Sequence, residues 1–221
     1  MIQLMHKDIL IQRKAILIVP LLLGVFIFQA HGITATASYN VINNLFLSIT
    51  LGMTAYIMVL YTNYSTGNNG DEAQTQLLIG LPVSRRSIVL AKYVMIGIWW
   101  IVTMICYSTL AILINVLSHS SVFSNINYSI LLSSLAFSYI FSSIFYPLNY
   151  LFGVRVAQLA SMVVFFIFMF LTRPLGKLFD NPSWISQFIM SHLLISITLL
   201  ALIVTACSLW LSLRVFQKKD W

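Results

Sequence analysis

The residues of this chain that could do chemistry are few, and their spacing matches no catalytic or metal-binding motif. The sequence contains no Walker A phosphate loop, no GxSxG nucleophile elbow and no HExxH zinc motif. The four histidines are scattered along the chain, at His6, His31, His119 and His192. Cys106 and Cys207 both lie inside apolar runs, where cysteine commonly serves as a small buried hydrophobic residue. The sequence therefore predicts no catalytic residue, no metal site and no cofactor held by this chain.

The longest connection between the predicted spans, residues 63–93, is polar and carries Asp71 and Glu72. It opens with Tyr-Ser-Thr-Gly-Asn-Asn-Gly at 64–70, a composition typical of turns. Asp71 then has the chemistry of a helix N-cap, and Gln74 three residues later approximates a capping box. Glu72 adds negative charge at the positive end of the helix dipole. The pattern predicts a short helix that begins at Asp71.

The same connection continues with an apolar edge and a basic elbow. The apolar edge consists of Leu77, Leu78 and Leu81. Gly80 and Pro82 end the helix, one as a C-cap residue and the other as a breaker. Ser84 can cap a new helix, whose first turns carry Arg85, Arg86 and Lys92. We therefore expect a rigid rod, a break and a basic elbow, while a segment that lies idle on the membrane surface is the simpler alternative.

The predicted rod is held between long apolar segments of the chain. Of 221 residues, 60% are hydrophobic and only 8% are charged, whereas about a quarter of an ordinary soluble domain is charged. A helix needs about 20 apolar residues to cross the hydrocarbon core of a bilayer. Six stretches qualify, at 16–36, 41–62, 94–117, 129–151, 156–172 and 189–213. The predicted fold is thus an all-α membrane protein with six transmembrane helices, whose six-span domain covers 16–221.

The distribution of basic residues predicts how these spans are oriented. With the N-terminus inside, ten of the 12 Lys and Arg residues fall on the cytoplasmic side: Lys7, Arg13, Lys14, Arg85, Arg86, Lys92, Arg155, Arg214, Lys218 and Lys219. The outside keeps only Arg173 and Lys177. Because cytoplasmic loops carry the excess of Lys and Arg, we expect both termini in the cytoplasm.

Two further segments are predicted to lie at the membrane surface. Residues 1–15 place Ile2, Met5 and Ile9 on one face, as expected for an interfacial amphipathic helix. A plain extension of the first span is the alternative. Residues 173–188 combine prolines with apolar residues, which predicts short re-entrant helices in the outer leaflet between spans five and six. An ordinary outer loop would also fit.

The spans contain no charge at their centres, but they do contain hydroxyl and amide groups. Ser134, Ser138 and Ser142 repeat every four residues on one face of the fourth span. The other candidates are Asn43 and Asn44 in the second span and Asn115 in the third. Such groups either allow helices to pack closely or line a polar pathway, and the sequence leaves both open. Pro147 should kink the fourth helix near its cytoplasmic end.

The stretch from Glu72 to Tyr93 resembles the cytoplasmic loop of bacterial type-2 ABC exporter permeases. It reads Glu-Ala-Gln-Thr-Gln-Leu-Leu-Ile-Gly-Leu-Pro-Val-Ser-Arg-Arg-Ser-Ile-Val-Leu-Ala-Lys-Tyr. The order of segments along the whole chain is also similar to that family. Within it, the chain looks most like the small permease subunits of staphylococcal exporters for phenol-soluble modulins, which are amphipathic peptides.

The resemblance implies a role for the predicted rod as a coupling helix that docks on an ATP-binding subunit. Carried onto this chain, the docking residues are Asp71, Glu72, Gln76, Leu77, Leu78 and Leu81, with Arg85 and Arg86 at the elbow. The implied partners are two cytoplasmic ABC ATPase subunits, which bind ATP and Mg²⁺, and a second permease copy or paralogue. The implied location is the bacterial plasma membrane, and the implied cargo is hydrophobic or amphipathic.

Three other classes of membrane protein were weighed against this assignment. A substrate-capture module of a vitamin importer also has six spans, but it would carry an Ala-xxx-Ala motif in the first span, which is missing here. An intramembrane protease would need paired glutamates and histidines within the spans, and these are missing too. A sensor or immunity protein that binds an antimicrobial peptide without transporting it cannot be separated from an exporter by sequence.

Overall fold

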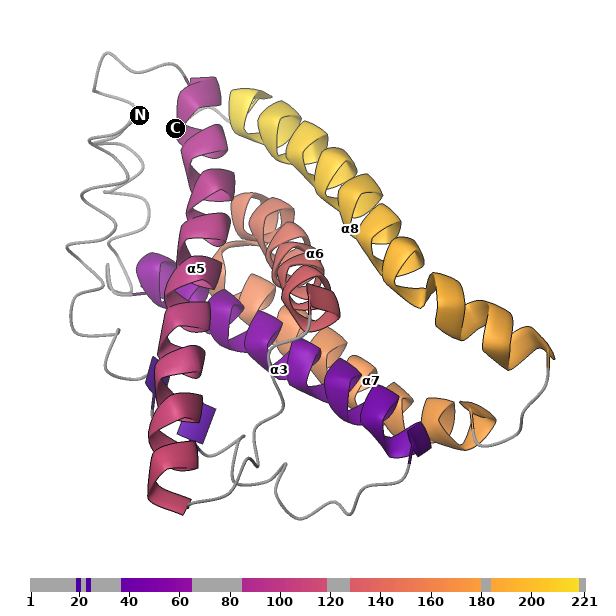
Figure 1. The fold of residues 1–221 in the computed structure, drawn as a ribbon. Helices are drawn as coiled ribbons and strands as arrows, with labels where there is room; N and C mark the ends of the chain where they lie inside the picture. Colours follow the sequence, from indigo (N-terminus) through magenta and orange to yellow (C-terminus); the bar gives the residue numbers. More distant parts are fainter. Residues whose placement is uncertain are drawn as a thin grey trace.

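A computed structural model describes residues 19–20, 23–24, 37–64, 85–118, 128–179 and 184–218 of this chain. Within these ranges the fold is entirely helical (Figure 1). The long helices are α3 (Ala37–Tyr64), α5 (Arg85–Ser118), α6 (Tyr128–Phe152), α7 (Val154–Phe179) and α8 (Trp184–Lys218). The predicted all-α class is confirmed for this part of the chain.

Four of these helices are long and apolar enough to cross a membrane. Their apolar windows are Asn44–Tyr61, Arg86–Ile114, Tyr128–Phe152 and Leu194–Phe216. These windows coincide with the second, third, fourth and sixth predicted spans, which are thereby confirmed as apolar helices. The fifth predicted span falls on α7, in which the described residues include a shorter apolar helical stretch, Val154–Ile167. The chain is therefore a multi-pass membrane protein.

The remaining predicted elements are not confirmed. The helix over 1–15 and the coupling helix over 71–81 lie outside the described residues, as does the first span apart from helical residues 19–20 and 23–24. The outer re-entrant helices were expected over 173–188. There the structure continues α7 to Phe179 and begins α8 at Trp184. Both ends of that segment thus belong to the long helices, because its apolar residues extend the pattern of the spans.

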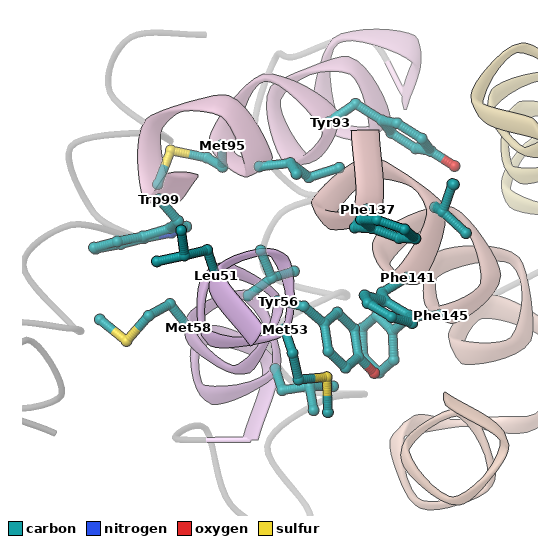
Figure 2. Packing of buried hydrophobic residues seen from close by; sticks show 14 of the residues in the cluster. Leu51, Met53, Tyr56, Met58, Tyr93, Met95, Trp99, Phe137, Phe141 and Phe145 are labelled. Carbon is teal, nitrogen blue, oxygen red and sulfur yellow. The ribbon is translucent and has the colours of Figure 1, made fainter. Parts of the chain in front are cut away.

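Helix α6 lies at the centre of the described bundle and contacts α3, α5, α7 and α8. Its sequence explains this position, because serines and large aromatic residues are distributed around the helix. Each face of α6 therefore carries side chains that can pack against a neighbouring helix. Phe141 and Phe145 lie against Tyr56 of α3, and Phe137 stacks on Phe141 (Figure 2). The ring centroids of Tyr56 and Phe145 are 6.0 Å apart in an edge-on arrangement. Pro147 sits inside α6 without ending the helix.

Helices α3 and α6 approach each other closely at Gly52. A Cβ atom built on Gly52 would lie 2.7 Å from Cβ of Phe137 and 3.0 Å from the backbone oxygen of Ser134. These are backbone-proximal atoms that cannot rotate away, so only glycine fits at this crossing. The absence of a side chain here lets the two helix backbones come nearly into contact.

A single residue, Gly153, separates α6 from α7. Its φ of +86° is left-handed, and its N–H donates to the carbonyl of Asn149 at 3.0 Å. This is the αL cap that commonly ends helices at glycine. Its own carbonyl accepts a hydrogen bond from the N–H of Ala157, which belongs to the first turn of α7. One left-handed residue therefore reverses the chain and sets α6 against α7.

We expect Gly52→Ala to destabilise the folded protein by about 1–3 kcal/mol, the usual cost of overpacking a closely packed contact. The midpoint of thermal unfolding of the purified Gly52→Ala protein in detergent should be lower than that of the unchanged protein. Gly24→Ala is the matched control, because nothing lies within 4 Å of the Cβ position at Gly24. Equal midpoints for the two variants would show that the crossing tolerates a side chain.

Candidate functional site

The predicted docking surface meets the described structure at the start of α5. This helix begins at Arg85, directly after the predicted cap at Ser84, and runs without interruption to Ser118. The expected new helix after Ser84 is therefore confirmed. Arg86 is exposed and Lys92 is half-buried. The predicted docking residues between Asp71 and Leu81 lie outside the described residues.

The serine stripe of α6 is fully buried between helices. Ser134, Ser138 and Ser142 each have 0% of their surface exposed. Ser134 and Ser138 lie at the Gly52 crossing with α3. The hydroxyl of Ser138 donates to the carbonyl of Leu135 in its own helix at 2.7 Å. The stripe is thus a contact surface in this conformation.

Among the three candidate asparagines, the structure describes the side-chain environment of Asn44 alone. Asn44 is half-buried in α3, and its carbonyl accepts a hydrogen bond of 2.6 Å from the hydroxyl of Ser48. Asn43 lies in α3 and Asn115 in α5, by their backbones. The side chains of these two asparagines fall outside the described part.

Hydroxyl groups form hydrogen bonds between helices at several levels of the bundle. Ser133 of α6 donates to Ser48 of α3 over 2.7 Å. The indole N–H of Trp100 in α5 donates to the hydroxyl of Ser134 over 3.1 Å. These bonds join α3 and α5 to the serine-rich face of α6. In a bilayer each such bond contributes on average about 0.6 kcal/mol.

Tyrosine hydroxyls make further links, two of them at the end of the bundle where α5 begins. Tyr56 of α3 donates to Ser161 of α7. Tyr93 of α5 is 2.6 Å from the hydroxyl of Ser208 and 3.1 Å from that of Ser212, both on α8. Tyr146 of α6 donates to the backbone carbonyl of Lys92 at 3.2 Å. Each described helix is therefore tied to another by a buried hydroxyl.

The serines of the α6 stripe were predicted as candidates, but the small residues at the contacts on the other helices were not. These also come in pairs four positions apart. The pairs are Ser48 and Gly52 in α3, Ala157 and Ser161 in α7, and Ser208 and Ser212 in α8. Ala157, Ser161 and Ser212 are completely buried. The small-xxx-small pattern is a known signal for close helix packing, and it could have found all three pairs.

The described residues hold no cluster of three His, Cys, Asp or Glu side chains that could bind a metal ion. Cys106 is half-buried on α5, and Cys207 is exposed on α8. Both thiols are free. The expected burial is met only in part by Cys106, and for Cys207 the expectation is wrong.

A family model described as ABC-2 family transporter protein matches residues 3–217. The match covers the predicted rod at 71–81 and all the described helices but the last residue of α8. No curated protein and no solved structure matches the chain.

We expect Ser138→Leu to destabilise the bundle by about 1–3 kcal/mol, because a leucine at this fully buried position must enter the contact with α3. The fraction of protein that stays monodisperse after heating in detergent reports the effect. Ser129→Leu is the matched control on the same helix, since Ser129 is exposed. A Ser138→Leu protein as stable as the control would show that the stripe faces open space rather than a neighbouring helix.

Proposed function

This chain belongs to the ABC-2 transporter family, and from this premise we propose that it is the transmembrane permease subunit of an ATP-driven exporter. Members of this family are membrane transport components that work with ABC ATPase subunits and are not catalytic themselves. The observation that carries the proposal is the family match over nearly the whole chain, including the segment predicted to dock on the ATPase.

The position of the basic residues supports a cytoplasmic location for the docking segment. Consecutive spans run in opposite directions, so the start of α5, the start of α7 and the end of α8 share one side of the membrane. Arg86, Arg155 and Arg214 lie at these three ends. Because Lys and Arg favour the cytoplasmic side, that side is the inner one, and the connection at 63–93 faces the cytoplasm with both termini.

The continuity of α5 supports a mechanical role for this connection. ATP binding would draw the two ATPase subunits together and push the rod at 71–81, which leads into α5 at Arg85. The hydrogen bond from Trp100 to Ser134 would pass that movement to α6, the central helix. The bundle would then exchange between inward-facing and outward-facing arrangements, as rigid helices do when they shift against one another.

The proposed substrate is hydrophobic or amphipathic. The described helices contain no Asp or Glu, and their Lys and Arg residues lie in the turns near the helix ends. A strongly charged cargo would need ionisable partners within the membrane, where a lone charge costs about 2.5–3.5 kcal/mol by insertion scales. Amphipathic peptides, such as phenol-soluble modulins or antimicrobial peptides, satisfy this condition. A second permease, identical or paralogous, would complete the pathway.

Close packing is the role we propose for Ser134, Ser138 and Ser142. All three serines are fully buried, and Ser134 and Ser138 lie at Gly52, where a Cβ atom would have no room. Family membership favours the exporter over the capture module of a vitamin importer. A peptide sensor of the same family would share the architecture, and ATP-dependent efflux of the peptide is the property that separates the two.

Replacing both Leu77 and Leu78 with aspartate should abolish co-purification with the ATPase, because two charges would replace the hydrophobic anchor of the docking helix. The measurement is affinity purification from membranes, with the partner identified by mass spectrometry as a protein carrying a Walker A sequence. Thr75→Asp adds charge to the same segment and is the control that should retain the ATPase. Undiminished ATPase recovery with the double variant, at equal membrane levels, would refute the docking role.

A thiol placed in the connection should react only from the cytoplasmic side. In a background with Cys106 and Cys207 replaced by alanine, Asn69→Cys should react with an impermeant maleimide in inside-out vesicles and not in right-side-out vesicles. Asp180→Cys, in the connection between α7 and α8, should show the opposite preference. Labelling of Asn69→Cys from the cell exterior would overturn the orientation and the docking role with it.

A further inference from the structure

Helices α5, α6 and α8 meet at Tyr93, about two helical turns after the start of α5. Only 4% of this residue is exposed. Its ring packs against Tyr146 of α6, with 5.1 Å between the ring centroids. Figure 2 shows Tyr93 apart from the aromatic cluster around Tyr56. Its hydroxyl bonds to two serines of α8. The residue therefore contacts both neighbouring helices at once.

The hydrogen bonds at this point have a definite direction. The hydroxyl of Ser208 donates its single proton to the backbone carbonyl of Ser143, 2.6 Å away. Ser208 can therefore only accept from Tyr93. Since the phenolic proton of Tyr93 is used in that bond, Ser212 must donate to Tyr93. The result is a directed chain from Ser212 through Tyr93 and Ser208 to the backbone of α6.

Pro147 explains why the carbonyl of Ser143 is available. In a helix this carbonyl would accept the N–H of the residue four positions later, which is Pro147, and proline has none. An unpaired carbonyl in the membrane interior is costly. The hydroxyl of Ser208 satisfies it from α8. The proline thus creates an acceptor on α6 that holds α8 in place.

Helix α8 lies at the edge of the described bundle. Only 11% of its apolar window is buried, against 50% for α5. Figure 1 shows its C-terminal end, in yellow, beside the start of α5, whereas its Trp184 end lies far from α5. The Tyr93 chain therefore joins α5 and α8 at the end where they are adjacent, and this end is the cytoplasmic one in the proposed orientation.

We propose that Tyr93, Ser208 and Ser212 form a cytoplasmic latch that must open for α8 to move away from α5 and α6 and admit an amphipathic substrate from the inner leaflet. This inference rests on the proposed export function. The latch lies about two turns from the end of α5 that the docking segment would push, so a small displacement of α5 breaks the hydrogen bonds. When they break, the carbonyl of Ser143 and the hydroxyls become accessible to polar groups of the cargo.

The test measures how fast a water-soluble reagent reaches position 143, which is buried next to the latch. In the background without Cys106 and Cys207, Ser143→Cys serves as reporter, because Ser143 is 2% exposed and its hydroxyl has no hydrogen-bond partner. Its backbone carbonyl, which Ser208 uses, is unchanged by the substitution. The full-length protein in native membrane vesicles is treated with a small, charged methanethiosulfonate, applied to either face.

Adding Tyr93→Phe, which keeps the ring and removes the hydroxyl, should raise the labelling rate of the reporter from the cytoplasmic face on the order of tenfold. The combined change Ser208→Ala and Ser212→Ala should raise the rate at least as much, because it also removes the bond from Ser208 to the carbonyl of Ser143. Adding Tyr93→Phe to these two changes should give no further rise, because the partners of its hydroxyl are already gone. Tyr56→Phe is the matched control. It also removes one buried tyrosine-to-serine bond, between α3 and α7, and should leave the rate unchanged.

Three results would overturn the latch. These are an unchanged rate with Tyr93→Phe, an equal rise with Tyr56→Phe, and a rise only when the reagent reaches the outer face. The experiment needs no ATPase and no identified cargo. A failure of the latch with ATPase binding intact would therefore count against this inference alone, and loss of ATPase binding with the latch intact would count against the export function.

Discussion

The described bundle depends on the close crossing of α3 and α6 at Gly52. Because the bilayer offers no hydrophobic driving force between helices, association relies on van der Waals contact and interhelical hydrogen bonds. Gly52 brings the α3 backbone to the Ser134–Ser138 region of α6. That approach sets the position of α6, against which α7 and α8 then pack. The aromatic side chains around Tyr56 fill the space on either side of the crossing.

The chemistry of the contact surfaces suits the proposed exchange between inward-facing and outward-facing arrangements. Serine hydroxyls bond to carbonyls of their own helix, as Ser138 does with Leu135, or to a neighbouring helix, as Ser133 does with Ser48. Exchange between these two kinds of partner costs little, since an interhelical hydroxyl bond in a membrane contributes about 0.6 kcal/mol. Interlocked large side chains would resist such exchange. Small polar residues at the crossings therefore combine close packing with the freedom to rearrange.

Helix α8 illustrates how one residue can link distant parts of the sequence. Pro147 removes an N–H from α6, and the acceptor left at Ser143 is satisfied by Ser208, 65 residues away. The same serine accepts from Tyr93, 115 residues away. A helix that is otherwise largely exposed is thereby tied to α6 and to α5, which follows the predicted docking segment in the chain. The aromatic contact between Tyr150 and Phe216, at 5.3 Å between centroids, adds to the same junction.

The sequence by itself determined the apolar helices, the start of α5 after Ser84 and the serine stripe of α6, because these follow from local periodicity and from the length a bilayer demands. Family membership was also visible in a local motif, the stretch from Glu72 to Tyr93. Only the tertiary structure decided which helices touch. The pairs Tyr93 with Ser208 and Tyr56 with Ser161 join residues more than 100 positions apart, and no local pattern specifies such a pair. The physical reason is that a buried hydroxyl takes whichever acceptor the packing brings within reach, and packing is a property of the whole bundle.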